Sequence, residues 1–200
     1  MADVLIREAQ VSDADVVSSL ILETGQSFLP LLFGPYVKVI LGRLIKTPGT
    51  VYSVDNIYVL EVEKGKVVGM IVAFAGNTIM KRAFKTGIAL FRIMGFDLIR
   101  RLPSFRLVWM RNKISRDEFY ISNIAVSREY RGMGYGKRLM EFAEELAKRN
   151  NFKKISLDVE NTNKQAIDLY KKLGYIGKKV NRVTIRNQKF TFVRMEKALK

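Results

Sequence analysis

The sequence predicts a fold of the α/β class, in which helices cover a β-sheet. Two stretches, 119–150 and 155–173, each have the pattern of a strand followed directly by a helix. Two others, 57–75 and 176–196, each contain a pair of apolar runs joined by a short polar turn, which is typical of β-hairpins. Two hundred residues of mixed strand and helix predict a single domain, 1–200.

Composition limits the chemistry that this chain can perform. Hydrophobic residues make up 48% and charged residues 27%, as in globular proteins. The chain has no cysteine and no histidine, which excludes disulfides, a thiol nucleophile, a histidine base and a histidine metal site. Proton transfer is left to carboxylates, tyrosine, lysine or water, and no metal site is predicted. The first residues lack the pattern of a signal peptide, so we expect a cytoplasmic protein.

The chain is strongly basic, with a net charge of +16. A basic surface favours polyanionic partners such as phosphate-bearing ligands, nucleic acid or anionic lipid. A lysine-rich surface that only keeps the protein in solution explains the charge equally well.

The first quarter of the chain predicts a strand and two helices. The strand is 4–8. Ser12 is expected to cap the helix that follows, with Asp15 three residues after it, and this helix should end near Gly25. The apolar stretch that follows contains two prolines, which divide it into a short piece and a helix over 36–46. Its prolines and basic residues argue against a membrane span.

The two hairpins are expected around turns that need positive φ angles. Their strands and turns are 57–63, 64–65 and 66–75 in the first hairpin, and 176–185, 186–187 and 188–196 in the second.

A long segment, 77–116, separates the first hairpin from the strand at 119–126. We expect a helix over 79–101, interrupted at its two glycines and ended by Pro103. From residue 80 on, the segment carries ten basic residues and one acid, a net charge of +9. It is too short to bury a core of its own, so we treat it as an insertion within the domain.

A glycine-rich loop, Arg131-Gly132-Met133-Gly134-Tyr135-Gly136, follows the strand at 119–126. Glycine tolerates positive φ, so the run can turn several N–H groups in one direction. The loop leads into a helix over 137–150, whose first N–H groups lack partners inside the helix. Together these features predict an anion cradle. A plain tight turn is the simpler explanation, and the spacing fits neither the P-loop nor the dinucleotide-binding motif.

The second strand–helix unit carries polar residues on one face of its strand. Over 155–160, period 2 places Ser156, Asp158 and Glu160 on the same side. The helix that follows is expected over 163–173.

Two motifs lie in these units. Arg131, Gly134 and Gly136 have the spacing Arg-x-x-Gly-x-Gly after a strand. The pattern Asn-x-x-Ala-x-x-Leu-Tyr, followed by a glycine–aromatic pair, is met by Asn163, Ala166, Leu169, Tyr170, Gly174 and Tyr175. In this order and at this separation the motifs resemble those of the GNAT superfamily of acyl-CoA-dependent N-acyltransferases. The resemblance is strongest over 118–178.

The resemblance implies a mixed, mostly antiparallel, splayed sheet flanked by helices. Members of that family usually pass from the third strand to the fourth through a short turn, so segment 77–116 is a helical insertion particular to this chain. The resemblance also implies acetyl-CoA as the co-substrate. Backbone N–H groups from Gly132 to Lys137, those of Met133 and Tyr135 included, would hold its pyrophosphate, and Arg131 would add charge or shape the loop. The pantetheine arm would pair with the strand edge at Ile124, Ala125 and Val126. Asn163 would hydrogen-bond the pantetheine or cap its own helix.

The resemblance further implies roles in catalysis. Tyr170 would act as general acid to the coenzyme thiolate, the alternative being a tyrosine that packs under the sheet. Asp158 is a candidate general base in the run Leu157-Asp158-Val159, with Glu118 and Glu160 as rivals. A chain of water molecules would serve in place of any single base.

The predicted function is transfer of an acetyl group to a primary amine by direct attack in a ternary complex. The amine is a protein N-terminus, a lysine or a small molecule. Two alternatives stay open, namely an acyl-CoA-binding sensor or adaptor without turnover, and a basic protein associated with nucleic acid or the ribosome. We expect the insertion to cover the acceptor end of the site and to select an acidic or extended acceptor. It would otherwise lie on a membrane surface, form a homodimer contact or simply cap apolar sheet surface.

Overall fold

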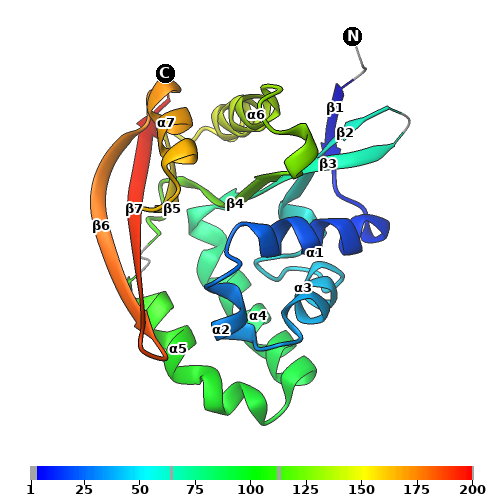
Figure 1. Cartoon of the computed structure of the whole chain (residues 1–200), viewed down its shortest axis with the longest axis vertical. Helices are drawn as coiled ribbons and strands as arrows, with labels where there is room; N and C mark the ends of the chain where they lie inside the picture. The colour runs from blue at the N-terminus through cyan, green and yellow to red at the C-terminus, as the bar shows by residue number, and fades with distance from the viewer. Residues whose placement is uncertain (1–3, 64, 112–113, 200) are drawn as a thin grey trace.

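One sheet lies between two layers of helices in the computed structural model of the chain (Figure 1). The structure describes residues 4–63, 65–111 and 114–199, and within these ranges it has seven strands. In chain order the strands are β1 (Val4–Glu8), β2 (Ile57–Val62), β3 (Lys66–Ala75), β4 (Phe119–Val126), β5 (Lys154–Glu160), β6 (Ile176–Ile185) and β7 (Gln188–Ala198). Their order across the sheet is β1-β2-β3-β4-β5-β7-β6. Neighbouring strands are antiparallel except β4 and β5, which confirms the predicted mixed sheet.

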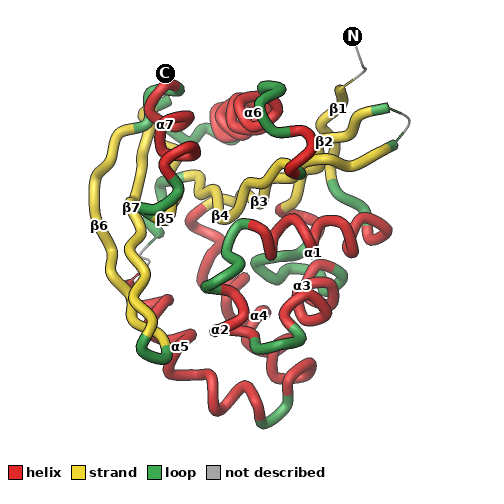
Figure 2. Tube along the Cα trace, in the orientation of Figure 1, coloured by secondary structure: helices red, strands yellow, loops and turns green. Residues whose placement is uncertain are grey.

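The helices divide between the two faces of the sheet (Figure 2). They are α1 (Ala14–Glu23), α2 (Leu29–Phe33), α3 (Val37–Ile45), α4 (Ile79–Met94), α5 (Asp97–Arg111), α6 (Tyr135–Arg149) and α7 (Lys164–Lys172). On one face, α6 and α7 pack through residues such as Leu139 and Tyr170 against the centre of the sheet. On the other face, α1 and α3 bury Ile21 and Leu41 against β2 and β3.

The sheet splays between β4 and β5, as predicted. The two strands pair over Phe119–Ile121 and Ile155–Leu157, although β4 continues to Val126 and β5 to Glu160. Beyond these pairs β4 keeps β3 as its neighbour and β5 keeps β7. The facing edges of β4 and β5 are therefore not joined to each other past Ile121.

The insertion contributes α4 and α5, which pack on the N-terminal helices. Ala89, Leu90 and Leu98 join the cluster formed by α1 and α3, so the segment shares the core of the domain. The rings of Phe33 in α2 and Phe105 in α5 meet edge to face with centroids 5.3 Å apart. The long β6–β7 hairpin reaches α5 from the other side (Figure 1).

The predicted cap of the first helix is wrong. A 3₁₀ turn over Val11–Asp13 precedes α1, and Ser12 makes no capping bond. Asp13 directly precedes α1, and its side chain does not cap that helix either. Its carboxylate instead accepts the N–H of Gln10 at 2.8 Å and pairs with Arg7 of β1 at 2.7 Å, which holds the turn before α1 against the sheet.

The interruption predicted at Gly95 is confirmed, because α4 ends at Met94 and Gly95 adopts a φ of +55° there. The interruption predicted at Gly87 and the end predicted at Pro103 are wrong, since Gly87 lies inside α4. The chain then forms α5, which continues through Pro103. The proline removes one hydrogen bond, to the carbonyl of Ile99, yet packing of Leu98 and Phe105 retains the helix.

The second hairpin turn is confirmed, since Arg186 and Asn187 have φ angles of +46° and +67°. In the first hairpin Gly65 has a φ of +99°, while Lys64 lies outside the described residues.

At Gly76, between β3 and α4, the start of the insertion lies very close to the backbone that leads into β4. The N–H of Gly76 donates to the carbonyl of Glu118 at 2.8 Å, and a Cβ at this position would overlap the carbonyl oxygen of Ser115. Because these are backbone atoms, Gly76→Ala should destabilise the protein by about 1–3 kcal/mol in urea unfolding. The control is Gly42→Ala in α3, where no described atom lies within 4 Å of a new Cβ and stability should not fall. Equal stability of the two variants would contradict the close approach at Gly76.

Candidate active site

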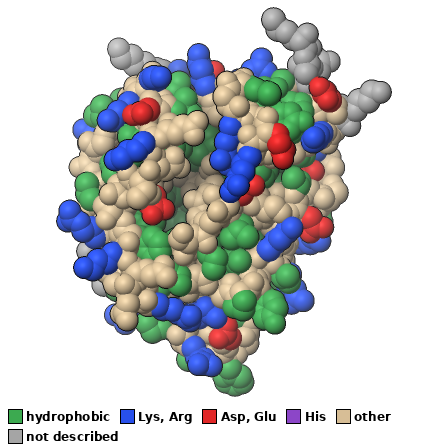
Figure 3. Space-filling model, in the orientation of Figure 1, with side chains coloured by type: hydrophobic (Ala, Val, Ile, Leu, Met, Phe, Trp, Pro, Cys, Tyr) green, Lys and Arg blue, Asp and Glu red, His purple; other side chains and the backbone are tan. Residues whose placement is uncertain are grey.

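A cavity of about 730 Å³ opens where β4 and β5 separate. Tyr120 and Asp158 line it from the face of the sheet that carries α4, whereas Ile121 and Tyr170 belong to the core under α6 and α7. The space-filling view shows this side of the molecule hollowed near its middle (Figure 3). The splay thus connects the two faces of the sheet through one cavity.

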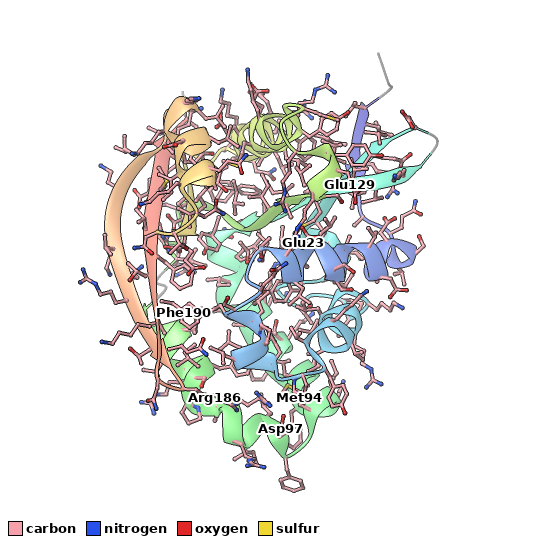
Figure 4. The ribbon with its side chains drawn as sticks, viewed as in Figure 1. Glu23, Met94, Asp97, Glu129, Arg186 and Phe190 are labelled. Carbon is pink, nitrogen blue, oxygen red and sulfur yellow. The ribbon has the colours of Figure 1, made fainter. Side chains whose placement is uncertain are left out.

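The walls of the cavity are mainly apolar. Helices α4 and α5 supply one wall with Leu90 and Phe105, and Phe28, just before α2, supplies another. The ring of Phe28 meets Phe190 and Phe192 of β7 edge on, with centroids 5.2 and 5.3 Å apart. Phe190 is labelled on β7 in Figure 4, opposite α2. The insertion therefore closes the cavity on the side away from α6 and α7.

Asp158 is held by a buried network of charges. Arg194 of β7 stands directly across from it in the β5–β7 register and approaches its carboxylate at 2.8 Å. The hydroxyl of Tyr120 donates to the same carboxylate at 3.0 Å. Arg194 also pairs with Glu118 at 3.2 Å. Glu118 is not among the described residues that line the cavity. Of the predicted carboxylates, Asp158 and Glu160 thus reach the cavity.

Tyr170 and Asn163 place α7 at the same cavity. Tyr170 is 5% exposed, and its burial raises the pKa of the phenol, so the hydroxyl keeps its proton at neutral pH. Asn163 caps α7, because its side-chain oxygen accepts the N–H of Ala166 at 3.1 Å. The predicted capping role is confirmed, and both side chains also line the cavity.

The glycine loop leaves its backbone open. Gly132 and Gly134 both have a φ of +82°, and no described atom lies within 4 Å of where a Cβ would stand. Gly134 is the N-cap of α6, which begins at Tyr135, two residues earlier than predicted. A Cβ on Gly136 would lie 3.4 Å from Leu169, the neighbour of Tyr170 in α7. The loop and the cavity are thus connected through α7.

Of the two roles predicted for Arg131, the contacts of its side chain favour shaping the loop. Its Nε donates to the carbonyl of Val126 at 2.9 Å, and its Nη2 pairs with Glu23 at 2.9 Å. Glu23 belongs to α1 (Figure 4), so Arg131 joins the end of β4 to the helices below the sheet. Met133 is exposed and Lys137 pairs with Glu141 at 3.6 Å.

The structure brings the predicted residues into two adjoining groups. Ile124, Asp158, Asn163 and Tyr170 line the cavity, and the loop at 131–137 lies beside α7. Ala125 and Val126 connect them along β4. Among the described residues there is no group of three His, Cys, Asp or Glu side chains that could hold a metal ion. The described helices include none with the length and apolar character needed to span a membrane.

Arg194 and Tyr120 were not found by the sequence reasoning. A single arginine within a predicted strand gives no sign of the residue across from it, because strand register is decided by the fold. Their partner Asp158 was identified from its own motif.

Removal of Arg194 should show how much the charge network stabilises the fold. Arg194→Met leaves Asp158 and Glu118 buried without their shared cation, which should cost about 3–5 kcal/mol in the free energy of unfolding. Lys148→Met is the matched control, since Lys148 pairs with Glu145 on the exposed side of α6 and should change stability by less than about 0.5 kcal/mol. A loss for Arg194→Met as small as the control's would show that the network is not stabilising.

Comparison with known proteins agrees with the fold and the motifs. A model of the acetyltransferase (GNAT) family matches residues 49–175. A Bacillus subtilis protein named for N-acetylation of the alanine of ribosomal protein bS18 is 43% identical over 61 residues, which are 30% of this chain and 40% of that protein. N-alpha-acetyltransferase 30 of Saccharomyces cerevisiae is 39% identical over 57 residues, 28% of this chain and 32% of that protein. The matches therefore span less than half of either relative.

Solved structures share the fold over nearly the whole chain. An N-acetyltransferase from Staphylococcus aureus Mu50 superimposes with a TM-score of 0.71 over 96% of this chain and 100% of that one, at 22% identity.

Proposed function

The chain belongs to the acetyltransferase (GNAT) family, and we propose that it transfers an acetyl group from acetyl-CoA to a primary amine. One observation carries the proposal. The cavity through the splayed sheet places Tyr170, Asp158 and the free edge of β4 together, next to an open glycine loop. Such a passage allows a donor on one side of the sheet and an acceptor on the other to meet, as a ternary complex requires.

The loop fits the pyrophosphate of acetyl-CoA. Gly132 and Gly134 leave space where side chains would stand, and the first N–H groups of α6, from Tyr135 on, lack partners inside the helix. Residues 124–126 of β4, which β5 does not pair, are suited to hold the amide-bearing arm. These residues are our candidates for coenzyme binding.

In the proposed reaction the amine nitrogen bonds to the acetyl carbon, and the bond from that carbon to sulfur breaks. The sulfur leaves as a thiolate, to which Tyr170 gives its proton. The ammonium that forms on the acceptor loses a proton to Asp158, directly or through water. We assign Asp158 this role because it lines the cavity and is oriented by Arg194 and Tyr120. Glu160 is the remaining rival.

The cradle is tested by Gly134→Val. A side chain would enter the space assigned to the phosphates, so affinity for acetyl-CoA should fall at least about a hundredfold in calorimetry. Gly65→Val is the control, because Gly65 also has a positive φ and open surroundings but lies in the β2–β3 turn. Both variants carry the same kind of backbone strain, so unchanged affinity in a folded Gly134→Val would remove the cradle from the proposal.

The acid is tested by Tyr170→Phe. Without the hydroxyl, kcat should fall by roughly 10²–10⁴ with little change in the affinity for acetyl-CoA. Since burial raises the pKa of Tyr170 above its usual value near 10, the wild-type kcat should show no loss from this group below about pH 10. A variant with near-normal kcat at saturating substrates would reduce Tyr170 to a packing role.

A further inference from the structure

We infer that the acceptor is a small amine with a bulky apolar body, which binds inside the cavity between α2, α4 and α5. The inference rests on the proposed acetyl transfer and names the class of acceptor for it. It concerns an aliphatic or aromatic monoamine, as distinct from a peptide N-terminus or a polyamine.

The size and lining of the cavity support an apolar body. The cavity has a volume of about 730 Å³, within the range of pockets that enclose small molecules, and the acceptor would share it with the reacting end of acetyl-CoA. The part away from β4 and β5 is lined by Phe28, Leu32, Phe33, Leu90, Leu98 and Phe105. These side chains offer no hydrogen bonds to a polar acceptor, so a peptide or polyamine would lose its water there without compensation.

The charges of the cavity support an amine. Of the described residues that line it, the charged ones are Arg106, Asp158 and Glu160. The carboxylate of Asp158 is paired with Arg194, whereas no ion pair of Glu160 is found among the described residues. Glu160 follows Asp158 by two positions on β5 and so shares its face of the sheet. Glu160 is therefore placed to attract an ammonium group to the reacting end.

Apart from Arg106, the described basic residues of the insertion do not line the cavity. Lys81, Lys85, Arg92 and Arg100 are exposed, and Arg101 is turned to Asp97 at 2.7 Å. Among the basic residues of the insertion whose side chains the structure describes, Arg106 lines the cavity, and it is exposed. The insertion has a net charge of +9, from which an acidic acceptor was expected. Because the cavity wall that it forms is mainly apolar, we expect an apolar acceptor in its place.

The first experiment compares acceptors by thiol release from acetyl-CoA, with the acetylated product identified by mass spectrometry. Hexylamine and 2-(2-aminoethoxy)ethanol have the same chain length. The second amine differs by one ether oxygen and one hydroxyl oxygen. We expect kcat/KM for hexylamine to be at least about tenfold higher, and 2-phenylethylamine to exceed spermidine and an alanine-initiated peptide likewise.

The second experiment fills the cavity. Ala83 lines it from α4, so Ala83→Trp should raise KM for hexylamine at least about tenfold while calorimetry shows unchanged binding of acetyl-CoA. Met80→Trp is the control, because Met80 lies on the same helix with its side chain 68% exposed and outside the lining. If Ala83→Trp does not fold, Glu160→Gln is the second variant, with the same expected rise in KM and unchanged acetyl-CoA binding.

The outcomes separate this inference from the proposed function. Faster turnover of the peptide, spermidine or the ether amine than of the apolar amines would overturn the inference and leave acetyl transfer intact. An Ala83→Trp enzyme with unchanged KM for hexylamine would also overturn it. No thiol release with any acceptor, although acetyl-CoA binds, would overturn the proposed function and the inference together.

Discussion

The parting of β4 from β5 after three paired residues is the constraint on which the candidate site depends. While two strands are paired, their edges are occupied by each other and the sheet is closed to side chains from the opposite layer. Once they part, Tyr170 of α7 and Asp158 on the other face of the sheet line the same cavity. The ion pair between Asp158 and Arg194 stands at this fork and ties β5 to β7, so β5 stays with its other neighbour as it leaves β4.

The insertion gives the cavity its second half. Without α4 and α5, the apolar residues of α2 and of the β6–β7 hairpin would face solvent on that side. Leu90 and Leu98 anchor the two helices in the common core, and the same apolar faces of the helices line the cavity. A segment that is basic in composition can thus present an apolar surface inward, because its exposed lysines and arginines occupy a different face of the same helices.

Several features of the site were predictable because they depend on residues close together in the chain. The glycine loop required Gly132 and Gly134 at positive φ, and the cap of α7 required Asn163 three residues before Ala166. The boundaries that were wrong depended on contacts with other elements. The carboxylate of Asp13 pairs with Arg7 of β1 and holds a 3₁₀ turn where Ser12 was expected to cap α1, and α5 passes through Pro103 because Leu98 and Phe105 pack in the core.

The sequence by itself determined the class of fold, the order of its strands and helices along the chain, the glycine loop and the motif residues on α7. These follow from periodicity and local backbone preference, which act over a few residues. The tertiary structure decided which strands separate, that Arg194 and Tyr120 hold Asp158, and that the insertion encloses an apolar cavity. Such features arise from register and packing between segments far apart in the chain, and no local pattern encodes them.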